Sequence, residues 1–596
     1  MVKVDYSRDV LLNPHGMSLL KNFYMRPWDT SPQDVYARAA TAFADDEAHA
    51  QRMYNYFSMQ WLGASSPILS NAPDPRDKRL KGLPIACFLG TVPDDIEGQY
   101  LAADERKRLS VLGGGVAEHV LIRGVDDKAA GPIPWVGTAN GDVKYYHQGG
   151  TRRGSIAEYL WYTHPDSVEF IGIRNPNGGD STRKCLDIHT SITFDYELLE
   201  LAKSGGDVEL RCPHSGELFD TIPARDMWQR MVNERYLRGE PFMCNVEEMN
   251  NALHPVLKAA GYKVHGSNLC TEIALVTADD MSAVCCLASP NAYYFEEWRD
   301  TPMIRDLVRY LDNVLTYTYN KLPDALWRIK RGIEMMRDIG IGLMGWHSLL
   351  QRKMIPFESG GVNSAAQWAF IIQDHIWKEA EAESLALGAE RGEAPAMKGT
   401  GRRNAHLIAI APTANNSIIN NCSPATEPYL TNYYTQRTRA GTVVHKNPEL
   451  DKLILNKIDK GEITASYDEV WDAIKADNGI LDNIEDDWFS EHELAVFRCF
   501  KQIDMTHVID QARIRQSRID QAQSTNLYFA AGAHVAYVNG MHMRAFDRDP
   551  QLPGVPLKTL YYLRTTTHAK ADNVGKAVVR EVIKDYESQE CTSCHG

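Results

Sequence analysis

Short apolar runs alternate with long amphipathic stretches along most of the chain. Beyond residue 82, runs rich in β-branched and aromatic residues predict strands at residues 83–89, 167–173, 189–194 and 405–411. Apolar positions spaced three and four residues apart predict helices at residues 225–237, 303–319 and 363–387. Strands that alternate with helices over about 500 residues indicate a large α/β fold.

The two ends of the chain have different patterns. Between Ser31 and Leu62, apolar side chains recur at helical spacing, and the Pro-, Asn- and Asp-rich stretch 70–81 follows as a loop. The chain ends in Cys591-Thr-Ser-Cys594-His-Gly after a helix-like stretch. We therefore predict a helical N-terminal region at residues 1–75, the main α/β domain at 76–572 and a C-terminal tail at 573–596.

Composition narrows the class of protein. The 596 residues are 44% hydrophobic, enough for a sizeable core, and 64 Lys and Arg against 78 Asp and Glu give a net charge of −14. An acidic chain argues against a dedicated nucleic-acid binder. No apolar run reaches the roughly 18 to 20 residues of a membrane span, and no signal peptide begins the sequence. We expect a soluble, cytoplasmic protein.

Eleven cysteines at irregular spacing do not form a secreted disulfide framework, so most should be reduced thiols. Glycine-rich loops occur at residues 113–115, 149–154 and 175–180, but none has the strand, G-x-G-x-x-G and helix context of a dinucleotide site. No metal-binding set of residues stands out.

The strongest chemical signal is Asn268-Leu-Cys270-Thr-Glu272. In an extended segment these three polar residues would project to one side, about 6.6 Å apart, whereas in a helix they could not converge. An amide, a thiol and a carboxylate would then offer a hydrogen-bond donor, a sulfur reagent and a general base. The alternative is a strand with a buried structural cysteine.

Several further motifs occur in the same chain, and together they resemble the large, catalytic subunit of class I ribonucleotide reductases from about residue 65 to the end. The resemblance implies a ten-stranded α/β barrel with Asn-x-Cys-x-Glu on a central finger loop. Besides that motif, the matching segments are Ile85-Ala-Cys87-Phe, Ala283-Val-Cys285-Cys-Leu, Arg337-Asp-Ile-Gly340-Ile-Gly342, Pro412-Thr-Ala-Asn-Asn-Ser417 and Lys558-Thr-Leu-Tyr561-Tyr562.

The resemblance implies roles for five residues. Cys270 would become the thiyl radical that takes hydrogen from C3′ of the ribose, Glu272 would be the base on the 3′-hydroxyl, and Asn268 would hold the ribose hydroxyls. Cys87 and Cys285 would reduce the intermediate and form a disulfide, which requires Cα atoms within about 7 Å. Cys286 would face the other way on a strand and be structural.

The internal disulfide would be reduced by the tail pair Cys591 and Cys594, which thioredoxin or glutaredoxin would reduce in turn. The alternative for that pair is a zinc half-site. Zinc needs about four ligands, however, and the tail offers few. A thiol-rich or zinc-binding module without catalysis would explain the tail but none of the other motifs.

Tyr561 and Tyr562, taken alone, could be two strand residues in a core. With the other motifs present, they resemble the relay that carries an oxidising equivalent from the metal cofactor of a separate small subunit to Cys270. We therefore expect no cofactor in this chain itself. The runner-up is an adenosylcobalamin-dependent reductase, which shares the cysteines but needs no relay.

Nucleotide contacts are also implied by the resemblance. The loop Pro412, Thr413, Ala414, Asn415, Asn416 and Ser417, with Ser66, would bind the diphosphate of the ribonucleoside diphosphate substrate. Asp94, Arg123 and Arg183 would bind a deoxynucleoside triphosphate or ATP effector, and residues 175–183 would relay its identity. We expect a homodimer that can depend on the effector.

The sequence departs from the family at its start. Cys87 comes too early for the usual N-terminal ATP-cone of about 90 residues, so we expect no overall control by dATP through a cone. Ala86 and Ala414 stand where many relatives have hydroxyl or acidic residues, which puts substrate contacts at these two positions in question.

Overall fold

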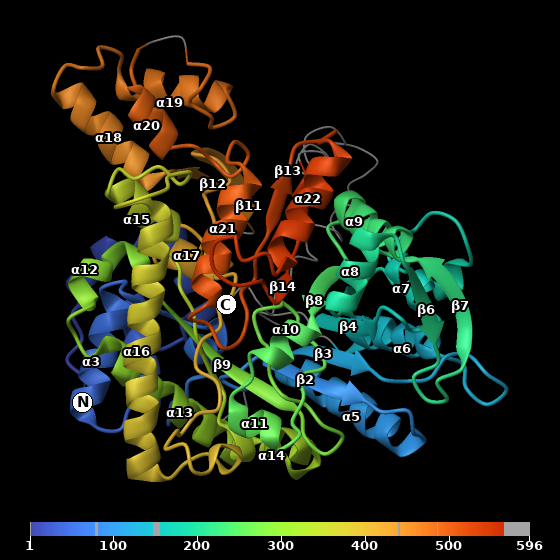
Figure 1. Cartoon of the computed structure of the whole chain (residues 1–596). Helices are drawn as coiled ribbons and strands as arrows, with labels where there is room; N and C mark the ends of the chain where they lie inside the picture. The colour runs from blue at the N-terminus through green and yellow to red at the C-terminus, as the bar shows by residue number, and fades with distance from the viewer. Residues whose placement is uncertain (1, 78–81, 147–154, 439–440, 485–486, 566–596) are drawn as a thin grey trace.

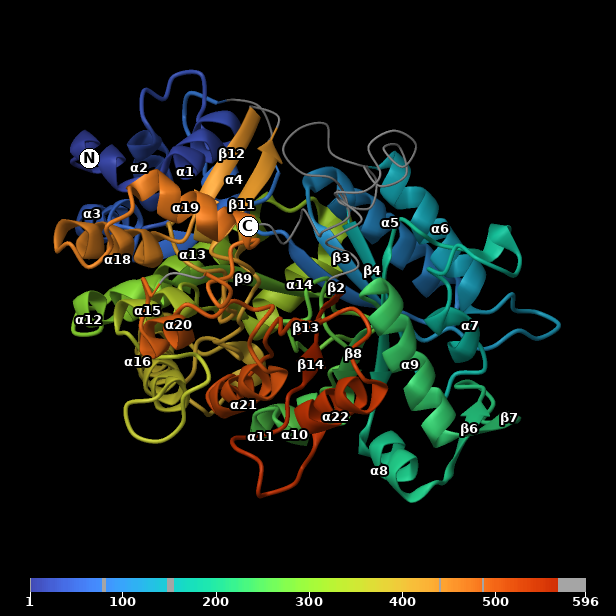
Figure 2. The same ribbon diagram turned by 90° about the horizontal axis from the view of Figure 1, so that it is seen from above.

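The computed structural model describes residues 2–77, 82–146, 155–438, 441–484 and 487–565 (Figure 1). The N-terminal part is mainly helical, as predicted. It packs beside the C-terminal half of the barrel rather than forming a separate body (Figure 2). Its elements are η1 (Tyr6–Leu11), α1 (Pro14–Leu19), η2 (Leu20–Tyr24), α2 (Pro32–Ala42), α3 (Glu47–Ser58), β1 (Leu62–Ala64) and α4 (Ser66–Asn71).

Five parallel strands form the first half of a barrel. They lie in the order β2, β3, β4, β5, β8, and almost every residue in them is buried, as expected for parallel strands covered on both faces. The strands are β2 (Cys87–Val92), β3 (Gly115–Val120), β4 (Ser155–Trp161), β5 (His189–Phe194) and β8 (Phe242–Asn245). The connecting helices include α5 (Ile96–Leu112), α6 (Pro132–Tyr145), α7 (Ser167–Ile171), α8 (Tyr196–Ser204) and α9 (Ala224–Arg238).

Five further segments form the second half. β9 (Ala283–Pro290) pairs in parallel with β10 (Ile339–Ile341), which is bridged to segment 405–411 and through it to segment 521–529. The last segment, 559–565, carries β14 (Thr559–Leu560) and β15 (Leu563–Thr565). It bonds to 521–529 through β13 (Leu527–Phe529) and through the Tyr561 amide, which donates to the Thr525 carbonyl at 2.9 Å.

The two halves meet at both edges in antiparallel fashion. β9 pairs with β2 on one side, and β14 pairs with β8 on the other. Five segments from each half therefore close a ring of ten. The predicted ten-stranded α/β barrel is confirmed.

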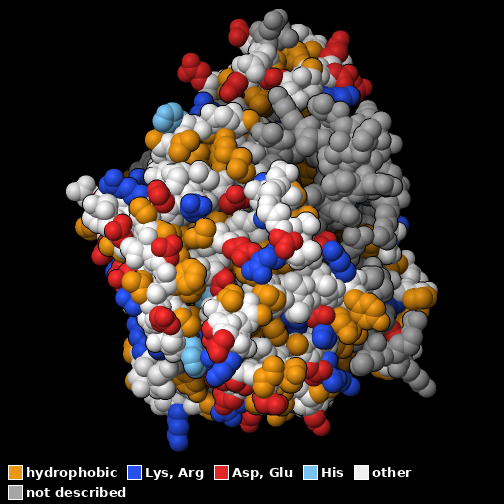
Figure 3. Space-filling view, turned by 90° about the vertical axis from the view of Figure 1, so that its right-hand side faces the viewer, with side chains coloured by type: hydrophobic (Ala, Val, Ile, Leu, Met, Phe, Trp, Pro, Cys, Tyr) orange, Lys and Arg blue, Asp and Glu red, His pale blue; other side chains and the backbone are white. Residues whose placement is uncertain are grey.

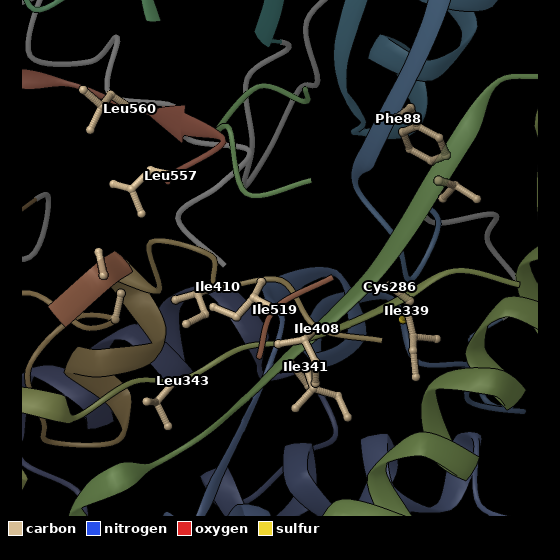
Figure 4. Close-up of a cluster of buried hydrophobic side chains, with 14 of the residues drawn as sticks. Phe88, Cys286, Ile339, Ile341, Leu343, Ile408, Ile410, Ile519, Leu557 and Leu560 are labelled. Atoms are coloured by element: carbon tan, nitrogen blue, oxygen red, sulfur yellow. The ribbon is translucent and has the colours of Figure 1, made fainter. Parts of the chain in front are cut away.

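Long helices cover the outside of both halves. The predictions at 225–237, 303–319 and 363–387 are confirmed as α9, α13 (Met303–Lys321) and α16 (Ala365–Arg391). In the second half, α13 contacts β9 and β10, and Ile339, Ile341, Ile408 and Ile410 lie together on the outer apolar face of β10 and segment 405–411 (Figure 4). Other helices of this half are α14 (Trp327–Met336), α15 (Trp346–Arg352), α17 (Ala414–Ile419), α21 (Met505–Gln516) and α22 (Val535–Phe546).

Three strand predictions need correction or adjustment. Residues 167–173 are not a strand: Ser167–Ile171 is helix α7, which packs against β4 and β5 and buries Phe170 and Ile171. The first strand begins four residues later than predicted, at Cys87. Segment 405–411 forms only isolated bridges, although these complete the barrel.

Two hairpins and a group of three helices lie outside the barrel. The hairpins are β6 (Asp207–Arg211) with β7 (Leu218–Pro223), and β11 (Tyr433–Thr438) with β12 (Gly441–Lys446). Helices α18 (Pro448–Asp459), α19 (Tyr467–Ala476) and α20 (Glu491–Val496) share a small core of their own. On the face in Figure 3, acidic and basic side chains are interspersed. Among the described residues, no helix has the length and apolar character to cross a membrane.

Candidate active site

The segment between α11 (Pro255–Ala259) and β9 runs through the barrel interior as a finger loop. Its tip is a turn: Thr271 has a left-handed φ of 65°, and its amide donates to the Asn268 carbonyl at 3.3 Å. The extended conformation predicted for this motif is therefore wrong. The turn still leaves Asn268, Cys270 and Glu272 buried, each at most 1% exposed.

Strands β3 and β4 hold the finger loop in place. His119 Nε2 lies 3.0 Å from the Ser267 carbonyl, and the Tyr159 hydroxyl donates to the Asn268 carbonyl. Burial lowers the pKa of His119 to about 3, so its imidazole is neutral and Nε2 can serve as the donor. The backbone of the tip is thus fixed from the first half of the barrel.

The second half of the barrel holds the other side of the tip. Ser524 Oγ donates to the Cys270 carbonyl at 2.5 Å, and Thr559 Oγ1 donates to the Thr271 carbonyl at 2.8 Å. The Tyr561 hydroxyl lies 3.3 Å from the Cys270 sulfur. The predicted thiol is therefore in direct contact with the predicted relay.

Glu272 has a buried carboxyl group, one oxygen of which forms no hydrogen bond within the described part of the chain. Its Oε2 lies 3.3 Å from Ser524 Oγ, while Oε1 has no hydrogen-bond partner among the described residues, and neither has Asn268 Nδ2. Burial raises the pKa of Glu272 to about 7. An acceptor and a donor left unpaired at one buried place suit a ligand with hydroxyl groups.

Cys87 and Cys285 are directly opposite each other. They are cross-strand partners in the antiparallel pair β2 and β9, and opposed residues in such a pair have Cα atoms about 4.5 to 5.5 Å apart, within the range of a disulfide. Both belong to the same buried inner cluster as Cys270 and Tyr561. The three sulfurs that the sequence singled out are therefore brought together inside the barrel.

The next residue along β9, Cys286, lies on the outer face of the sheet. It belongs to the outer apolar core and sits beside Ile339 (Figure 4). Strand alternation predicts this orientation. Burial raises the pKa of the Cys286 thiol well above its usual value, so it behaves as a small apolar side chain.

Two residues support Cys285: Gln521, which no sequence motif included, and Gly340, from the motif at residues 337–342. Gln521 Nε2 lies 3.9 Å from its sulfur and also donates to the Ile339 carbonyl at 2.8 Å. Gly340 leaves room for the sulfur, because a Cβ there would lie 2.9 Å from it. Burial, followed by the nearby charges of Cys87 and Asp338, raises the pKa of the Cys285 thiol. Cys285 is therefore held as an S–H group.

Tyr561 and Tyr562 form a close aromatic pair. Their ring centroids are 4.3 Å apart, and both rings pack on Phe242, at 4.8 and 5.0 Å. Tyr561 is buried, whereas Tyr562 is partly exposed. The Tyr562 hydroxyl lies 3.2 Å from His189 Nδ1. The pair thus runs from the finger loop toward the barrel exterior.

The predicted phosphate loop precedes and begins a short helix. Thr413 has a left-handed φ of 53°, and α17 begins at Ala414 after Pro412. Asn416 is buried, and its Oδ1 has no hydrogen-bond partner in the described part of the chain. Asn415 and Ser417 lie in the first turns of α17. Ser66 begins α4 and shares a 2.6 Å hydrogen bond with the Tyr24 hydroxyl.

The predicted effector residues are only partly brought together. Arg123 contacts Asp94 twice, through its amide at 2.9 Å and its Nε at 2.7 Å. Arg183 instead forms a bidentate pair with Glu169 at 2.6 and 2.8 Å. His214, from the β6–β7 hairpin, adds a contact to Asp94 at 3.1 Å. The sequence motifs gave no sign of His214.

The predicted tail pair, Cys591 and Cys594, lies outside the described residues. Within the described ranges, no cluster of three or more His, Cys, Asp or Glu side chains could hold a metal ion.

Comparison with known proteins decides the family. Residues 85–400 and 395–563 match the family described as ribonucleotide reductase, barrel domain, and residues 10–77 match ribonucleotide reductase, all-alpha domain. The chain belongs to the ribonucleotide reductase family. The resemblance inferred from the sequence motifs is confirmed.

Relatives within the ribonucleotide reductase family align over nearly the whole chain. The ribonucleoside-diphosphate reductase large subunit of Invertebrate iridescent virus 3 is 35% identical over 657 aligned positions, which cover 100% of both chains. The large-subunit homologue of Frog virus 3 (isolate Goorha) is 37% identical over 551 residues and covers 92% of each.

A solved structure gives the class. The class Id ribonucleotide reductase α subunit of Actinobacillus ureae superposes with a TM-score of 0.78 at 28% identity, covering 95% of this chain and 98% of that chain. Because this neighbour is a class I subunit, the adenosylcobalamin-dependent alternative is not favoured.

Proposed function

We propose that this chain is the catalytic subunit of a ribonucleoside-diphosphate reductase. It converts ribonucleoside diphosphates to 2′-deoxyribonucleoside diphosphates by radical chemistry. The observation that carries the proposal is the contact between the Tyr561 hydroxyl and the Cys270 sulfur in the same buried cluster as Cys87 and Cys285.

Cys270 would start and end the reaction. As a thiyl radical it takes the hydrogen atom from C3′ of the ribose and forms its S–H bond, and it returns a hydrogen atom to C3′ at the end. Glu272, whose pKa burial raises to about 7, is suited to accept the 3′-hydroxyl proton near neutral pH. The unpaired Nδ2 of Asn268 is placed to donate a hydrogen bond to the substrate hydroxyls.

Cys87 and Cys285 would supply the reducing equivalents. Their two thiols give two electrons and two hydrogens: one proton leaves with the 2′-hydroxyl as water, and one hydrogen goes to C2′. The thiols become a disulfide, which the opposed positions of the two residues in β2 and β9 favour. The overall reaction turns a ribonucleotide and a dithiol into a deoxyribonucleotide, a disulfide and water.

Tyr561 and Tyr562 would connect Cys270 to a separate small subunit, whose metal cofactor supplies the radical. Tyr562 becomes a radical by losing an electron to that subunit and a proton to its surroundings. A hydrogen atom then passes from Tyr561 to Tyr562, and another from Cys270 to Tyr561. The 4.3 Å ring separation and the 3.3 Å O···S contact support these two transfers.

Other functional residues follow from the family resemblance. Cys591 and Cys594 would reduce the Cys87–Cys285 disulfide and be reduced by thioredoxin or glutaredoxin. We propose residues 76–572 as the catalytic barrel, 1–75 as its helical N-terminal region and 573–596 as the redox tail. An effector-dependent homodimer is the expected assembly.

Two nucleotide sites belong to the same proposal. The loop 412–417 and Ser66 would hold the substrate diphosphate, and the unpaired amide oxygen of Asn416 marks a polar site there. Asp94 and Arg123 would contact a nucleoside triphosphate effector, and their mutual ion pair holds both side chains at one place. Arg183 would act from the neighbouring loop.

Activity in the reconstituted enzyme tests the function. The chain is mixed with its small subunit, CDP, an effector and dithiothreitol, and dCDP is measured by chromatography. We expect product with the native chain and none with Cys270→Ser, while Cys499→Ser, a buried cysteine far along the chain, serves as the control. Product from the Cys270 variant, or product without a small subunit when adenosylcobalamin is added, would overturn the proposal.

A further inference from the structure

Tyr562 contacts a buried histidine, which in turn contacts a buried glutamate, and the reaction scheme above uses neither of them. His189 Nδ1 lies 3.2 Å from the Tyr562 hydroxyl and 2.7 Å from Glu240 Oε1. His189 and Glu240 are each 4% exposed. His189 is the first residue of β5, and Glu240 lies just before β8. A polar pair at this depth is fixed in place and touches the outer member of the tyrosine pair.

The contacts of Glu240 define which nitrogen carries the proton. Glu240 Oε2 accepts the Thr190 amide at 3.0 Å and lies 3.6 Å from Arg174 Nε. Burial opposes ionisation of Glu240, but the charge of Arg174 and the hydrogen bonds from His189 and Thr190 hold its pKa below the usual value. A carboxylate can only accept, so the hydrogen-bond network assigns the proton to His189 Nδ1.

That assignment makes Tyr562 an acceptor. The Nδ1–H that points at Glu240 is shared with the Tyr562 oxygen as a second, longer contact. A phenol oxygen has one O–H and accepts through its lone pairs, so its own hydrogen then cannot point at the imidazole. The Tyr562 O–H must therefore be turned toward other partners.

Aromatic packing prevents the imidazole from swinging away. His189 stacks on Phe242 with an interplanar angle of 18° and a centroid distance of 5.9 Å. Tyr562 meets the same Phe242 ring edge-on, at 89°, and meets His189 at 79°. The three rings thus hold one another in a single arrangement around the proposed relay.

We propose that His189, oriented by Glu240, is a positioning residue for the radical relay. It donates a hydrogen bond to the oxygen of Tyr562, fixes the direction of the Tyr562 O–H and continues to bond that oxygen when Tyr562 is a radical. The inference rests on the proposed function of Tyr562. A purely structural role for the His189–Glu240 pair is the competing explanation.

Three variants separate these explanations through turnover. His189→Ala removes the donor and should lower kcat about tenfold, the scale of one hydrogen bond, with KM for CDP unchanged. His189→Asn places an amide N–H where Nδ1 stands and should restore most of kcat. Glu240→Gln can donate to Nδ1 and reverse the tautomer, so it should lower kcat as His189→Ala does.

A trapped radical provides a readout that stability does not affect. Tyr562 is replaced by 3-aminotyrosine in the holoenzyme with the small subunit, CDP and effector, and the radical is examined by electron paramagnetic resonance and ENDOR in H2O and D2O. We expect an exchangeable proton coupling from the donated hydrogen bond. That coupling should be lost in His189→Ala and kept in His189→Asn.

Controls distinguish failure of the inference from failure of the function. His347→Ala removes another buried histidine, one that bonds the Tyr429 amide at 3.0 Å; it should lower the melting temperature without changing kcat or the coupling. If the native enzyme makes dCDP but His189→Ala keeps full kcat and the same coupling, the inference is wrong while the function stands. If the native enzyme makes no dCDP, the proposed function itself fails.

Discussion

The hydroxyl oxygen of Tyr561 lies 3.3 Å from the sulfur of Cys270, although 291 residues separate them in the sequence. Two backbone contacts produce this approach. The Tyr561 amide donates to the Thr525 carbonyl, and the Thr559 hydroxyl donates to the Thr271 carbonyl at the tip of the finger loop. The strand that carries the tyrosine is therefore bonded directly to the loop that carries Cys270.

Removing only that hydroxyl should stop turnover. Tyr561→Phe keeps the ring in the inner cluster but cannot pass a hydrogen atom to or from Cys270, so we expect dCDP formation to fall to background with CDP binding unchanged. Tyr310→Phe is the matched control, because Tyr310 is also buried and its hydroxyl donates to the Ala39 carbonyl at 2.7 Å, away from the finger loop. Near-native activity of Tyr561→Phe would contradict the relay.

The activity should depend on pH through Glu272. Burial raises its pKa to about 7, and only the ionised carboxylate can accept a proton. We expect kcat/KM to rise roughly tenfold per pH unit below that value and to level off above it. Glu272→Gln should lower kcat about 100-fold or more and remove this limb of the profile. A native profile that is flat from pH 5.5 to 8 would show that Glu272 is not the base.

The same carboxyl should make stability pH-dependent, with a defined sign. The folded pKa of about 7 lies above the unfolded value of 4.5, so between these pH values the folded state holds a proton that the unfolded state has lost. Stability from this group is therefore lost as pH rises, by up to roughly 3 kcal/mol above pH 7. From pH 5 to pH 8, the urea concentration at the unfolding midpoint should fall more for the native protein than for Glu272→Gln.

Local patterns were sufficient to predict much of the fold. Helices α9, α13 and α16 have long amphipathic repeats, and β5 is a compact β-branched run, so each was predicted within a few residues. The strand prediction at residues 167–173 failed because seven residues do not define a period, and packing against β4 and β5 selected a helix. Segment 405–411 has too few ladder bonds to be recognised as a regular strand.

The sequence motifs predicted the residues of the site itself. They could not predict the residues that support it. Ser524, Gln521 and His119 contact the finger loop or Cys285 from strands far away in the sequence. Nothing adjacent to them in the sequence signals that role, because it depends on which barrel strands face each other. The extended geometry assumed for residues 268–272 was wrong for a related reason: side chains from both barrel halves bond to the backbone of the tip and hold it in a turn.

Cys87 and Cys285 should become a disulfide in a single turnover. A chain with Cys591→Ser and Cys594→Ser, in which the tail cannot reduce the internal disulfide, is given CDP and the small subunit without an external reductant, and thiols are counted and peptides mapped by mass spectrometry. We expect one Cys87–Cys285 disulfide per dCDP formed, because the two residues are direct cross-strand partners. Cys286→Ser is the control: its side chain faces the outer core, so it should cost stability but leave the disulfide yield unchanged.

Adding a single methyl group at Gly340 should disturb both the fold and the Cys285 sulfur. A Cβ at this position would lie 2.9 Å from the Cys285 sulfur and would also contact the Leu287 side chain, so a methyl group must displace one of them. We expect Gly340→Ala to destabilise the fold by about 1 to 3 kcal/mol, the usual range for overpacking, and to slow disulfide formation in the single-turnover assay. Gly360→Ala is the matched control, since a Cβ there meets nothing within 4 Å. If Gly340→Ala forms the disulfide at the native rate with an unchanged melting temperature, the sulfur is not confined by β10 as the structure indicates.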